Sequence, residues 1–384
     1  MSIIRNLPNT LKQMAIHGRE LPSTPDIDIK LHLEAAIDWI LRAREHSHDG
    51  GIPAFFDLLR GRWASSYPET TGYTIPTMFA SSRYLKRRDL HEIASELADY
   101  LLKARTPEGG VGHWKRQDGE RPTPVVFDTG QVIFGWLASW HETGNNTHLQ
   151  AAVSAADWLV AVQAGSGAWL DYQYLDTVKV IDTRVAWALL RVAQVVTRPS
   201  LVETARRNLD WALSQQQSNG WFRRAGFCAG DDPFTHTIAY TAEGLLECGL
   251  ALQEDRWITA AQKVAHALLE RQHPDGSLAS TYDSNWQPAS RSSCLTGNCQ
   301  VALLWLRLYG QSGEERYLDA ARKTISFVTR TQDLHTSDAN TRGAIAGSYP
   351  IYGRYERFKY PNWAAKFFVD ALLALQAADK AAGG

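Results

Sequence analysis

The sequence predicts an all-α protein folded as an (α/α)6 toroid, a closed ring of six helical hairpins. Three observations lead to this prediction. An amphipathic stretch, a loop rich in Gly and aromatic residues, and a second, more apolar stretch recur six times along the chain. Successive recurrences are 53 to 66 residues apart, about what two helices and two connections require. Strand signals are few, limited to short loop pieces such as GSLASTYD. Such repetition is the sequence signature of a repeat architecture.

The first stretch of each repeat is predicted to be an outer helix, because its charged residues fall on one face and its apolar residues on the other. The first of these helices starts near Asp28, and Leu33, Ile37 and Ile40 recur within it at helical spacing. The remaining outer helices are predicted over residues 93–104, 148–163, 202–216, 257–272 and 314–330.

The second stretch of each repeat is predicted to be an inner helix, since it is poor in charge and rich in Ala, Gly, Leu and Trp. A helix that is apolar all round is packed on all sides, as the inner ring of a toroid would be. Each of these stretches opens with a polar residue: Glu69, Asp128, Asp182, Thr235, Thr296 and Asn362.

The connections alternate in length. The turn after each inner helix is short, as in QEDR, whereas the loop before it is long and rich in Gly and aromatic residues. All six long loops are therefore expected on one face of the ring. Because function concentrates on loops carried by a rigid scaffold, we predict the site on this face, at the loop-facing ends of the inner helices.

The chain is predicted to form an N-terminal arm over residues 1–28 and a single toroid domain over residues 29–384. Pro8, Pro22 and Pro25 interrupt the arm, and no linker or charge block divides the rest. The net charge of −1 gives no bulk attraction to nucleic acid. No run of about 18 apolar residues is present, so no membrane insertion is expected.

No cofactor or metal is expected. The cysteines (Cys228, Cys248, Cys294 and Cys299) match no zinc spacing, and Walker, dinucleotide-binding, GxSxG and HExxH motifs do not occur. The first residues lack the apolar core of a secretory signal, and the cysteines are interpreted as reduced. A cytoplasmic location is therefore expected. The pattern carries no prediction of oligomeric state.

Three carboxylates stand where inner helices begin: Glu69 in YPETTGY, Asp128 in FDTGQ and Asp182 in IDTR. One interpretation of Asp128 and Asp182 is that they are helix N-caps, where Asp is favoured. The other is catalytic, because Asp128 and Asp182 open neighbouring helices and would approach one another across the mouth of the ring. Acid–base work on a glycosidic linkage needs one carboxyl kept protonated and another kept ionised. Asp128, Asp182 and Glu69 are thus the candidate catalytic residues.

Other polar and aromatic residues are expected to face the same mouth and to bind a substrate, although side chains of these kinds are often only core or solvated. The chain holds 14 Trp and 14 Tyr, and aromatic faces suit partly apolar ligands such as sugars. Arginine suits a carboxylate through its planar fork. The candidates are Tyr73, Trp114, Gln131, Arg184, Trp221, His236, Tyr240, Asn298, Tyr352, Arg354, Asn362, Trp363 and Lys366.

The six-hairpin pattern, over about residues 30–380, resembles the six-hairpin glycosidase superfamily. Within it, Asp128 in FDTGQ and Asp182 in IDTR are similar to the two aspartates of unsaturated glucuronyl hydrolases, which also open neighbouring inner helices. The resemblance implies a metal-free enzyme in which one Asp protonates the C4=C5 vinyl ether of a 4,5-unsaturated uronide and assists its hydration. We therefore expect hydrolysis of an acidic, uronate-containing oligo- or polysaccharide.

Alternatives stay open. YPETTGY, GSYPIYGRY and YPNWAAKFF lie outside that pattern, so a polysaccharide lyase or uronosyl epimerase on the same toroid, with Tyr or His removing the C5 proton, is one alternative. WLVAVQAGSGAW and WALSQQQSNGW resemble the Q…G–W repeats of terpenoid cyclases and prenyltransferases, where Gln caps a helix and stacks on Trp. The DxDD motif of the cyclases is absent. A catalytically inactive carbohydrate-binding toroid is the last alternative.

Overall fold

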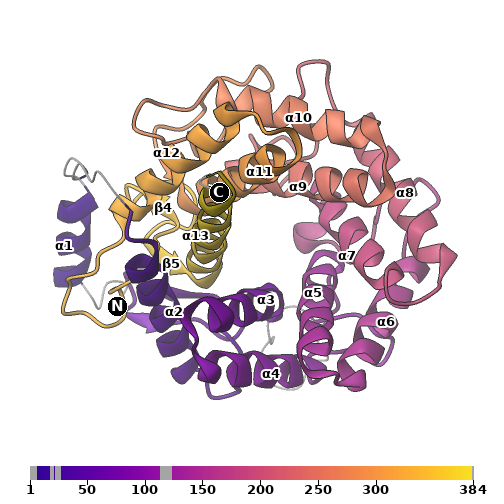
Figure 1. The fold of residues 1–384 in the computed structure, drawn as a ribbon, viewed down its shortest axis with the longest axis horizontal. Helices are drawn as coiled ribbons and strands as arrows, with labels where there is room; N and C mark the ends of the chain where they lie inside the picture. The colour runs from indigo at the N-terminus through magenta and orange to yellow at the C-terminus, as the bar shows by residue number, and fades with distance from the viewer. Residues whose placement is uncertain (1–6, 18–20, 22–26, 113–122, 383–384) are drawn as a thin grey trace.

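The computed structural model describes residues 7–17, 21, 27–112 and 123–382. Its helices form two concentric layers around a central axis (Figure 1). The inner layer consists of α3 (Pro68–Leu85), α5 (Val126–Thr143), α7 (Thr183–Ala193), α9 (Thr235–Leu252), α11 (Leu295–Ser312) and α13 (Asn362–Ala382). The outer layer consists of α2 (Ile29–Glu45), α4 (Arg88–Leu102), α6 (Asn146–Ala161), α8 (Pro199–Ser214), α10 (Asp255–Leu269) and α12 (Glu315–Thr331). The predicted (α/α)6 toroid is confirmed.

The ring closes by pairing the two ends of the chain. Each inner helix packs against the next, and α13 returns to pack against α3. The first five inner helices each form a hairpin with the outer helix that follows, whereas the sixth hairpin joins α13 to α2. Close approach of inner helices depends on glycine. A Cβ on Gly135 would lie 2.5 Å from the Gly72 carbonyl oxygen, and one on Gly244 would lie 2.4 Å from the Thr183 carbonyl carbon.

Indole and amide side chains tie the layers together. The indole of Trp136 in α5 donates to the Ala98 carbonyl oxygen in α4 at 3.2 Å. Four glutamines just after outer helices donate to a backbone carbonyl of the next outer helix, namely Gln163 to Thr204, Gln216 to Ala260, Gln272 to Ala320 and Gln332 to His32. The Q…G–W repeats therefore serve the fold, and the last of these bonds crosses from α12 to α2 where the ring closes.

Helix boundaries follow the sequence pattern. The inner helices begin within two residues of the predicted starts, and every outer helix overlaps its predicted range. Asp28 caps α2, because its side chain accepts a hydrogen bond from the Leu31 N–H at 3.0 Å. Helix α4 starts at Arg88, before the predicted residue 93, since the turn after α3 needs only Lys86 and Arg87, with Lys86 in the left-handed region at φ 56°.

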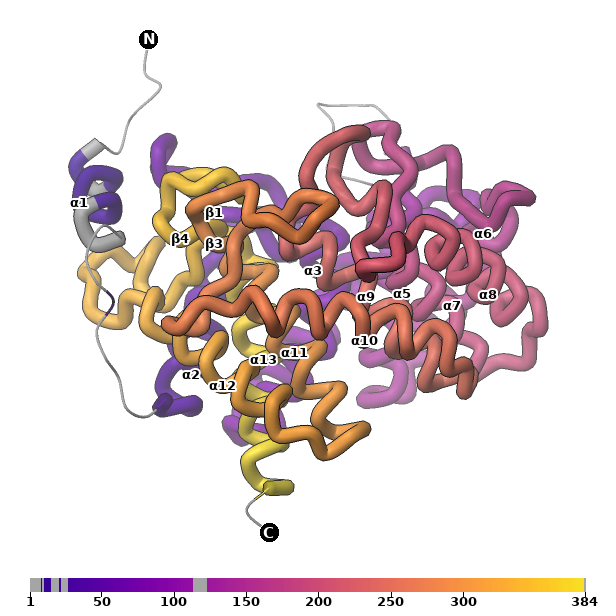
Figure 2. The backbone as a smooth tube through the Cα atoms, turned by 90° about the horizontal axis from the view of Figure 1, so that it is seen from above, coloured from indigo at the N-terminus to yellow at the C-terminus, as the bar shows by residue number. Residues whose placement is uncertain are grey.

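The long loops gather at one end of the ring and the short turns at the other (Figure 2). Strand β1 (Phe55–Asp57) pairs antiparallel with β2 (Arg62–Trp63) and with β5 (Lys359–Pro361), and β3 (Ser293–Cys294) pairs antiparallel with β4 (Ser348–Tyr349). In the order β2-β1-β5, Phe56 lies opposite both Trp63 and Tyr360. This sheet joins the loop before α3 to the loop before α13, so the loop face is also closed where the ring closes.

The predicted N-terminal arm contains a helix, α1 (Leu7–His17), beside the ring. Pro8 lies in its first turn, where a missing N–H breaks no intrahelical hydrogen bond. Thr10 donates to the Leu58 carbonyl oxygen at 3.5 Å, and Tyr360 donates to Gln13 Oε1 at 3.0 Å, so α1 docks beside the three-stranded sheet. The prolines at positions 22 and 25 lie outside the described residues, and the division into arm and toroid stays a prediction.

The aromatic content is divided between core and loops. The largest side chains with no exposed surface include Trp39, Trp136, Trp169, Trp257 and Trp305, which pack within the toroid.

Within the described ranges, none of the helices combines the length and the hydropathy that a membrane span requires.

Candidate active site

A pocket opens at the loop end of the ring, where the first turns of inner helices meet the long loops. This ring pocket encloses about 820 Å³ of empty space, including the part open to solvent, a size typical of small-molecule sites. Its lining is mostly aromatic, with three carboxyl groups, a lysine and a histidine: Phe55, Tyr67, Glu69, Tyr73, Phe127, Asp128, Tyr174, Ile181, Phe227, His236, Tyr240, Tyr355, Glu356, Lys359 and Trp363. In the part of the chain that the structure describes, no three His, Cys, Asp or Glu side chains are grouped to hold a metal ion.

Two carboxyl groups share one tyrosine hydroxyl inside the ring pocket. Tyr67 directly precedes α3, Glu69 lies in the first turn of α3, and Asp128 lies in the first turn of the neighbouring α5. The Tyr67 hydroxyl oxygen is 2.5 Å from Glu69 Oε2 and 3.2 Å from Asp128 Oδ1. Tyr67 and Val125 occupy the N-cap positions of these helices. The N-cap interpretation is therefore wrong for Asp128, whereas Asp182 does occupy the N-cap position of α7, although its side chain makes no capping hydrogen bond. Glu69 and Asp128 both line the ring pocket.

The surroundings of Glu69 favour the protonated form of its carboxyl. Burial raises the pKa of Glu69 well above its usual range, and the adjacent Asp128 carboxylate raises it further. The hydrogen bond from Tyr67 and the charge of Arg184 act in the opposite direction but do not overcome the burial. A protonated carboxyl beside a second carboxyl is an arrangement that can supply one proton and accept another.

A histidine on the lining is held in its neutral form. Burial lowers the pKa of His236 to about 4, although its hydrogen bond to Gln300 opposes the shift. His236 Nδ1 donates to Gln300 Oε1 at 2.7 Å, which leaves Nε2 as the proton acceptor of the ring. The imidazole packs against Tyr240 and Tyr355, with ring centroids 4.4 Å and 5.3 Å away. His236 can therefore accept a proton or a hydroxyl hydrogen bond from a bound molecule.

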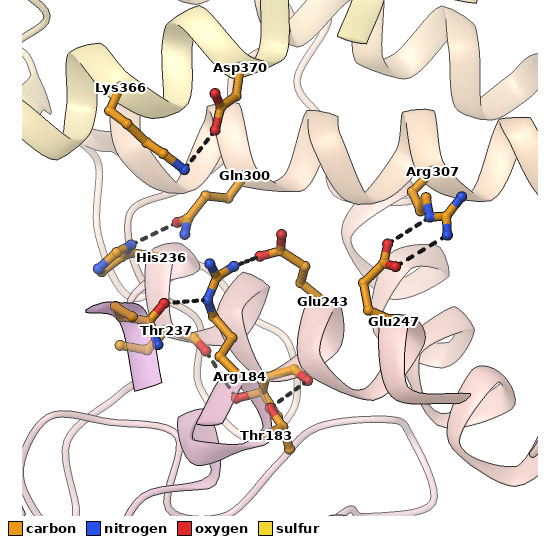
Figure 3. A network of polar contacts seen from close by, with 12 residues as sticks. Thr183, Arg184, His236, Thr237, Glu243, Glu247, Gln300, Arg307, Lys366 and Asp370 are labelled. Atoms are coloured by element: carbon orange, nitrogen blue, oxygen red, sulfur yellow. Dashed lines mark hydrogen bonds and ion pairs between the residues drawn. The ribbon is translucent and has the colours of Figure 1, made fainter. Parts of the chain in front are cut away.

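A network of charged and polar side chains links neighbouring inner helices of the ring (Figure 3). Arg184 forms an ion pair with Glu243 and donates through Nε to Gln131 Oε1 at 3.0 Å. Its guanidinium lies 4.7 Å from the centre of the Tyr240 ring. On α13, Lys366 pairs with Asp370 at 2.6 Å and lies 5.1 Å from the centre of the Tyr73 ring.

This network changes the roles expected for three of its members. Arg184, Gln131 and Lys366 were predicted to touch substrate, but none of them belongs to the pocket lining that the structure describes. Gln131 and Arg184 are already paired with side chains of neighbouring inner helices, and Lys366 is paired with Asp370 on its own helix, as buried charged groups must be. They support Tyr73 and Tyr240 from behind.

Asp182 departs from the expected pairing with Asp128. A 3₁₀ turn (Val180–Asp182) precedes α7 and directs Ile181, not Asp182, into the ring pocket. The Asp182 carboxylate accepts a hydrogen bond from Gln173 Nε2 at 2.9 Å, and its Oδ1 has no hydrogen-bond partner among the described residues. Burial raises the pKa of Asp182 to about 7, against the nearby charge of Lys179. The carboxyl beside Asp128 is that of Glu69, which corrects the expectation.

Two predicted asparagines are structural. Asn298 and Asn362 have no exposed surface, and their amides donate to the carbonyl oxygens of Cys294 and Pro53, each at 2.8 Å. Asn298 also accepts from the Leu278 N–H at 3.0 Å. These amides hold the ends of long loops on the helix starts, so the expectation that they contact substrate is corrected.

The remaining predicted residues divide between the ring pocket and other places. Tyr73, His236, Tyr240 and Trp363 line the ring pocket, and the Trp363 indole donates to the Tyr355 hydroxyl at 2.9 Å. Tyr352 and Arg354 are exposed and stand outside its described lining, and Trp221 lines a separate cavity. Trp114 lies outside the described residues.

Several lining residues did not stand out in the sequence. Tyr67 and Tyr355 lie in aromatic-rich loops, which was a usable signal. Phe55 and Lys359 meet only because β1 pairs with β5 across about three hundred residues of chain. The Lys359 ammonium lies 4.2 Å from the centre of the Phe55 ring and 2.7 Å from Glu356 Oε2, and no motif marks these neighbours.

The fold of this chain is the (α/α)6 toroid, which also occurs in solved structures of sugar-modifying enzymes. No known family model matches the sequence, and no curated protein matches it either.

Three solved structures illustrate the likeness. An unsaturated glucuronyl hydrolase from a Bacillus species superposes with a TM-score of 0.73 at 16% identity, over 91% of this chain and 97% of its own. A cellobiose 2-epimerase from Bacillus thermoamylovorans gives 0.71 at 12% identity, over 90% of this chain and 98% of its own. An α-mannanase from Bacteroides thetaiotaomicron gives 0.68 at 12% identity, over 93% and 97%. At these identities the likeness shows the fold alone.

Proposed function

We propose that this protein is a carbohydrate-active enzyme that performs acid–base chemistry on a sugar in the ring pocket. The observation that carries the proposal is the Tyr67 hydroxyl, placed 2.5 Å from Glu69 Oε2 and 3.2 Å from Asp128 Oδ1. The pair stands in a pocket walled by aromatic rings, whose faces suit the apolar faces of sugars. The likeness in fold to a glycosidase, a mannanase and a sugar epimerase supports the same assignment.

The close contact of the two carboxyl groups favours one type of hydrolysis. Displacement at an anomeric carbon uses carboxyl groups on opposite sides of the sugar, about 5–9.5 Å apart. Glu69 and Asp128 interact directly and share Tyr67, so they face one side of a substrate. Protonation and hydration of a vinyl ether fit this arrangement, which supports a 4,5-unsaturated uronide as the substrate.

The proposed reaction balances within this pair. Glu69 gives its proton to C4 of the double bond, which leaves an oxocarbenium ion at C5. A water molecule adds to C5, and its proton goes to Asp128. The resulting hemiketal opens to a ketone at C5, which leaves a hemiacetal at C1. The hemiacetal then breaks down to an aldehyde and releases the second sugar as an alcohol. The proton on Asp128 then returns to Glu69 through their hydrogen bond. Lys359 is the cation of the described lining that would receive the uronate carboxylate.

A second candidate, an epimerase or lyase reaction, is supported by His236. Its neutral ring presents Nε2 as an acceptor in the same pocket, where it could remove a proton from carbon.

The test is a screen of acidic polysaccharides and their unsaturated oligosaccharides, in which the ultraviolet absorbance of the conjugated double bond is followed. Loss of absorbance supports the hydrolase, and a gain indicates a lyase. Constant absorbance with deuterium uptake from the solvent indicates an epimerase. The Asp128→Asn protein is the control for contaminating activity. Constant absorbance without deuterium uptake on every sugar would overturn the proposal.

A further inference from the structure

A second cavity lies on the loop face. It encloses about 1190 Å³ of empty space, including the part open to solvent. The loops before α7, α9 and α11 form most of it, through residues 177–178, most of the segment from Trp221 to Asp232, and residues 283–284. We call it the outer groove. Two of these loops, those before α7 and α9, also contribute to the ring pocket. All of them belong to the long loops at one end of the ring (Figure 2).

The two cavities share one wall. Phe227 lines the ring pocket, while its chain neighbours Gly226 and Cys228 line the outer groove. Tyr174 likewise lines the ring pocket, while Thr177 lines the outer groove. The Tyr174 and Phe227 rings are in contact, with centroids 6.4 Å apart, and Tyr174 is 41% exposed. The loops that carry Tyr174 and Phe227 therefore separate the two cavities. A molecule that extends past these two rings from the ring pocket would enter the outer groove.

The loop that carries Tyr174 contains residues with strained backbone conformations and exposed side chains. Tyr172, Leu175 and Asp176 have φ values of 59°, 58° and 47°, a region that costs energy for residues other than glycine. The buried Lys179 ammonium donates to the carbonyl oxygens of Tyr174 and Thr177 and so fixes the turn. Tyr172 and Leu175 are 43% and 52% exposed. Strain of this kind concentrates at binding sites, where it holds side chains ready for a ligand.

The outer groove has the chemistry of a sugar subsite. The half-exposed Trp221 supplies an aromatic face. Arg224 and the carboxylates of Asp231 and Asp232 are exposed along it and can form paired hydrogen bonds with vicinal hydroxyl groups. We propose that the outer groove is a second subsite, which binds the units of an oligosaccharide that extend beyond the sugar in the ring pocket. This inference rests on the proposed function of the ring pocket.

The test compares short and long oligosaccharides. Titration calorimetry on the Asp128→Asn protein, which does not consume its ligands, uses unsaturated di- and hexasaccharides of hyaluronan, chondroitin and heparin. The hexasaccharide is expected to bind about tenfold more tightly than the matching disaccharide, as one aromatic contact with its hydrogen bonds would provide. Adding Trp221→Ala should abolish this advantage and leave disaccharide affinity unchanged. The control is Trp140→Ala, a half-exposed Trp in the last turn of α5.

A second variant guards against misfolding. Arg224 has φ 61°, and Asn tolerates this region, so Arg224→Asn removes the guanidinium without adding strain. It should also reduce the preference for the hexasaccharide over the disaccharide, by about threefold or more. The proposed subsite is refuted if the hexasaccharide binds no more tightly than the disaccharide. It is also refuted if both variants still bind the hexasaccharide more tightly than the disaccharide by the same factor as the Asp128→Asn protein. If neither length of any sugar binds, the proposed function of the ring pocket itself fails, and the subsite fails with it.

Discussion

Asp128 and Asp182 occupy equivalent places in adjacent repeats, yet they stand in different surroundings. Asp128 faces the ring pocket and shares the Tyr67 hydroxyl with Glu69. Asp182 lies behind the pocket, bonded to Gln173 and close to Lys179. The difference comes from the preceding backbone. Val125 leads directly into α5 in an extended conformation, whereas a 3₁₀ turn precedes α7 and places Ile181 on the lining.

This comparison shows that a repeat position specifies where a side chain starts, but the loop before it decides where the side chain points. It also separates two ways of keeping a carboxyl protonated. The pKa of Glu69 is raised by burial and by its contact with a second carboxyl, that of Asp128. Burial raises the pKa of Asp182 to about 7, and this carboxyl lies near Lys179 and outside the described lining of the ring pocket. Four predictions test the distinction, from the largest expected effect to the smallest.

Asp128→Asn should lower kcat by at least about a hundredfold, because the amide cannot take up the proton of the attacking water. The melting temperature should change little, since Asn keeps the shape of the side chain. Steady-state kinetics on an oligosaccharide consumed in the screen, with calorimetry for folding, measures both. Near-normal kcat in this variant, together with a large loss in Asp182→Asn, would reverse the comparison.

Glu69→Gln should cause a similar loss, of about a hundredfold, and should also change the pH profile. The pKa of Glu69 is raised, so the proton donor is present at low pH and is lost as the pH rises through that pKa. Wild-type kcat/KM should therefore fall on the alkaline side, by about tenfold per pH unit beyond the pKa. The residual activity of the variant should lack this decline. An unchanged alkaline decline in Glu69→Gln would assign the donor elsewhere, with His236 or Tyr240 next to be tested.

Tyr67→Phe should lower kcat by about tenfold, the value of one hydrogen bond to a charged group. The Tyr67 hydrogen bond lowers the pKa of Glu69, so its removal should move the alkaline decline to higher pH. Tyr84→Phe is the matched control, because the Tyr84 hydroxyl bonds to Gln376 away from the ring pocket. A loss of activity without any shift of the pH profile would mean that Tyr67 only packs.

Asp182→Asn should change kcat by less than about threefold, because its carboxyl does not line the ring pocket. The main effect of this substitution is expected in how the free energy of unfolding depends on pH. The pKa of Asp182 is about 7 in the folded chain and about 3.9 in the unfolded chain. A raised pKa contributes stability below the unfolded value and loses it as the pH rises through the folded value.

The free energy of unfolding of the wild type should therefore fall relative to the Asn variant as the pH is raised through this interval. Urea unfolding on both sides of the interval measures the difference. If the variant is instead destabilised most on the alkaline side, the attraction to Lys179 outweighs burial and the environment inferred for Asp182 is wrong.

The sequence by itself determined the architecture. The alternation of amphipathic and apolar stretches places each helix in the outer or inner ring, because burial of apolar side chains is what separates the layers. The alternation of short turns and long loops places the site at one end of the ring. Glu69, Asp128, His236 and Tyr240 were found in this way, since they lie in the first two turns of inner helices that begin at the loop face.

Only the tertiary structure decided which side chains meet. The local turn before α7 directs Ile181 instead of Asp182 into the ring pocket. Neighbouring inner helices supply the partners of Arg184 and Gln131. Phe55 and Lys359 join the lining because the ring closes through strands from its two ends. Helical periodicity specifies the face of one helix, but a pocket at the centre of a ring is made by six helices and their loops. Its lining depends on contacts between residues distant in sequence, which no local pattern encodes.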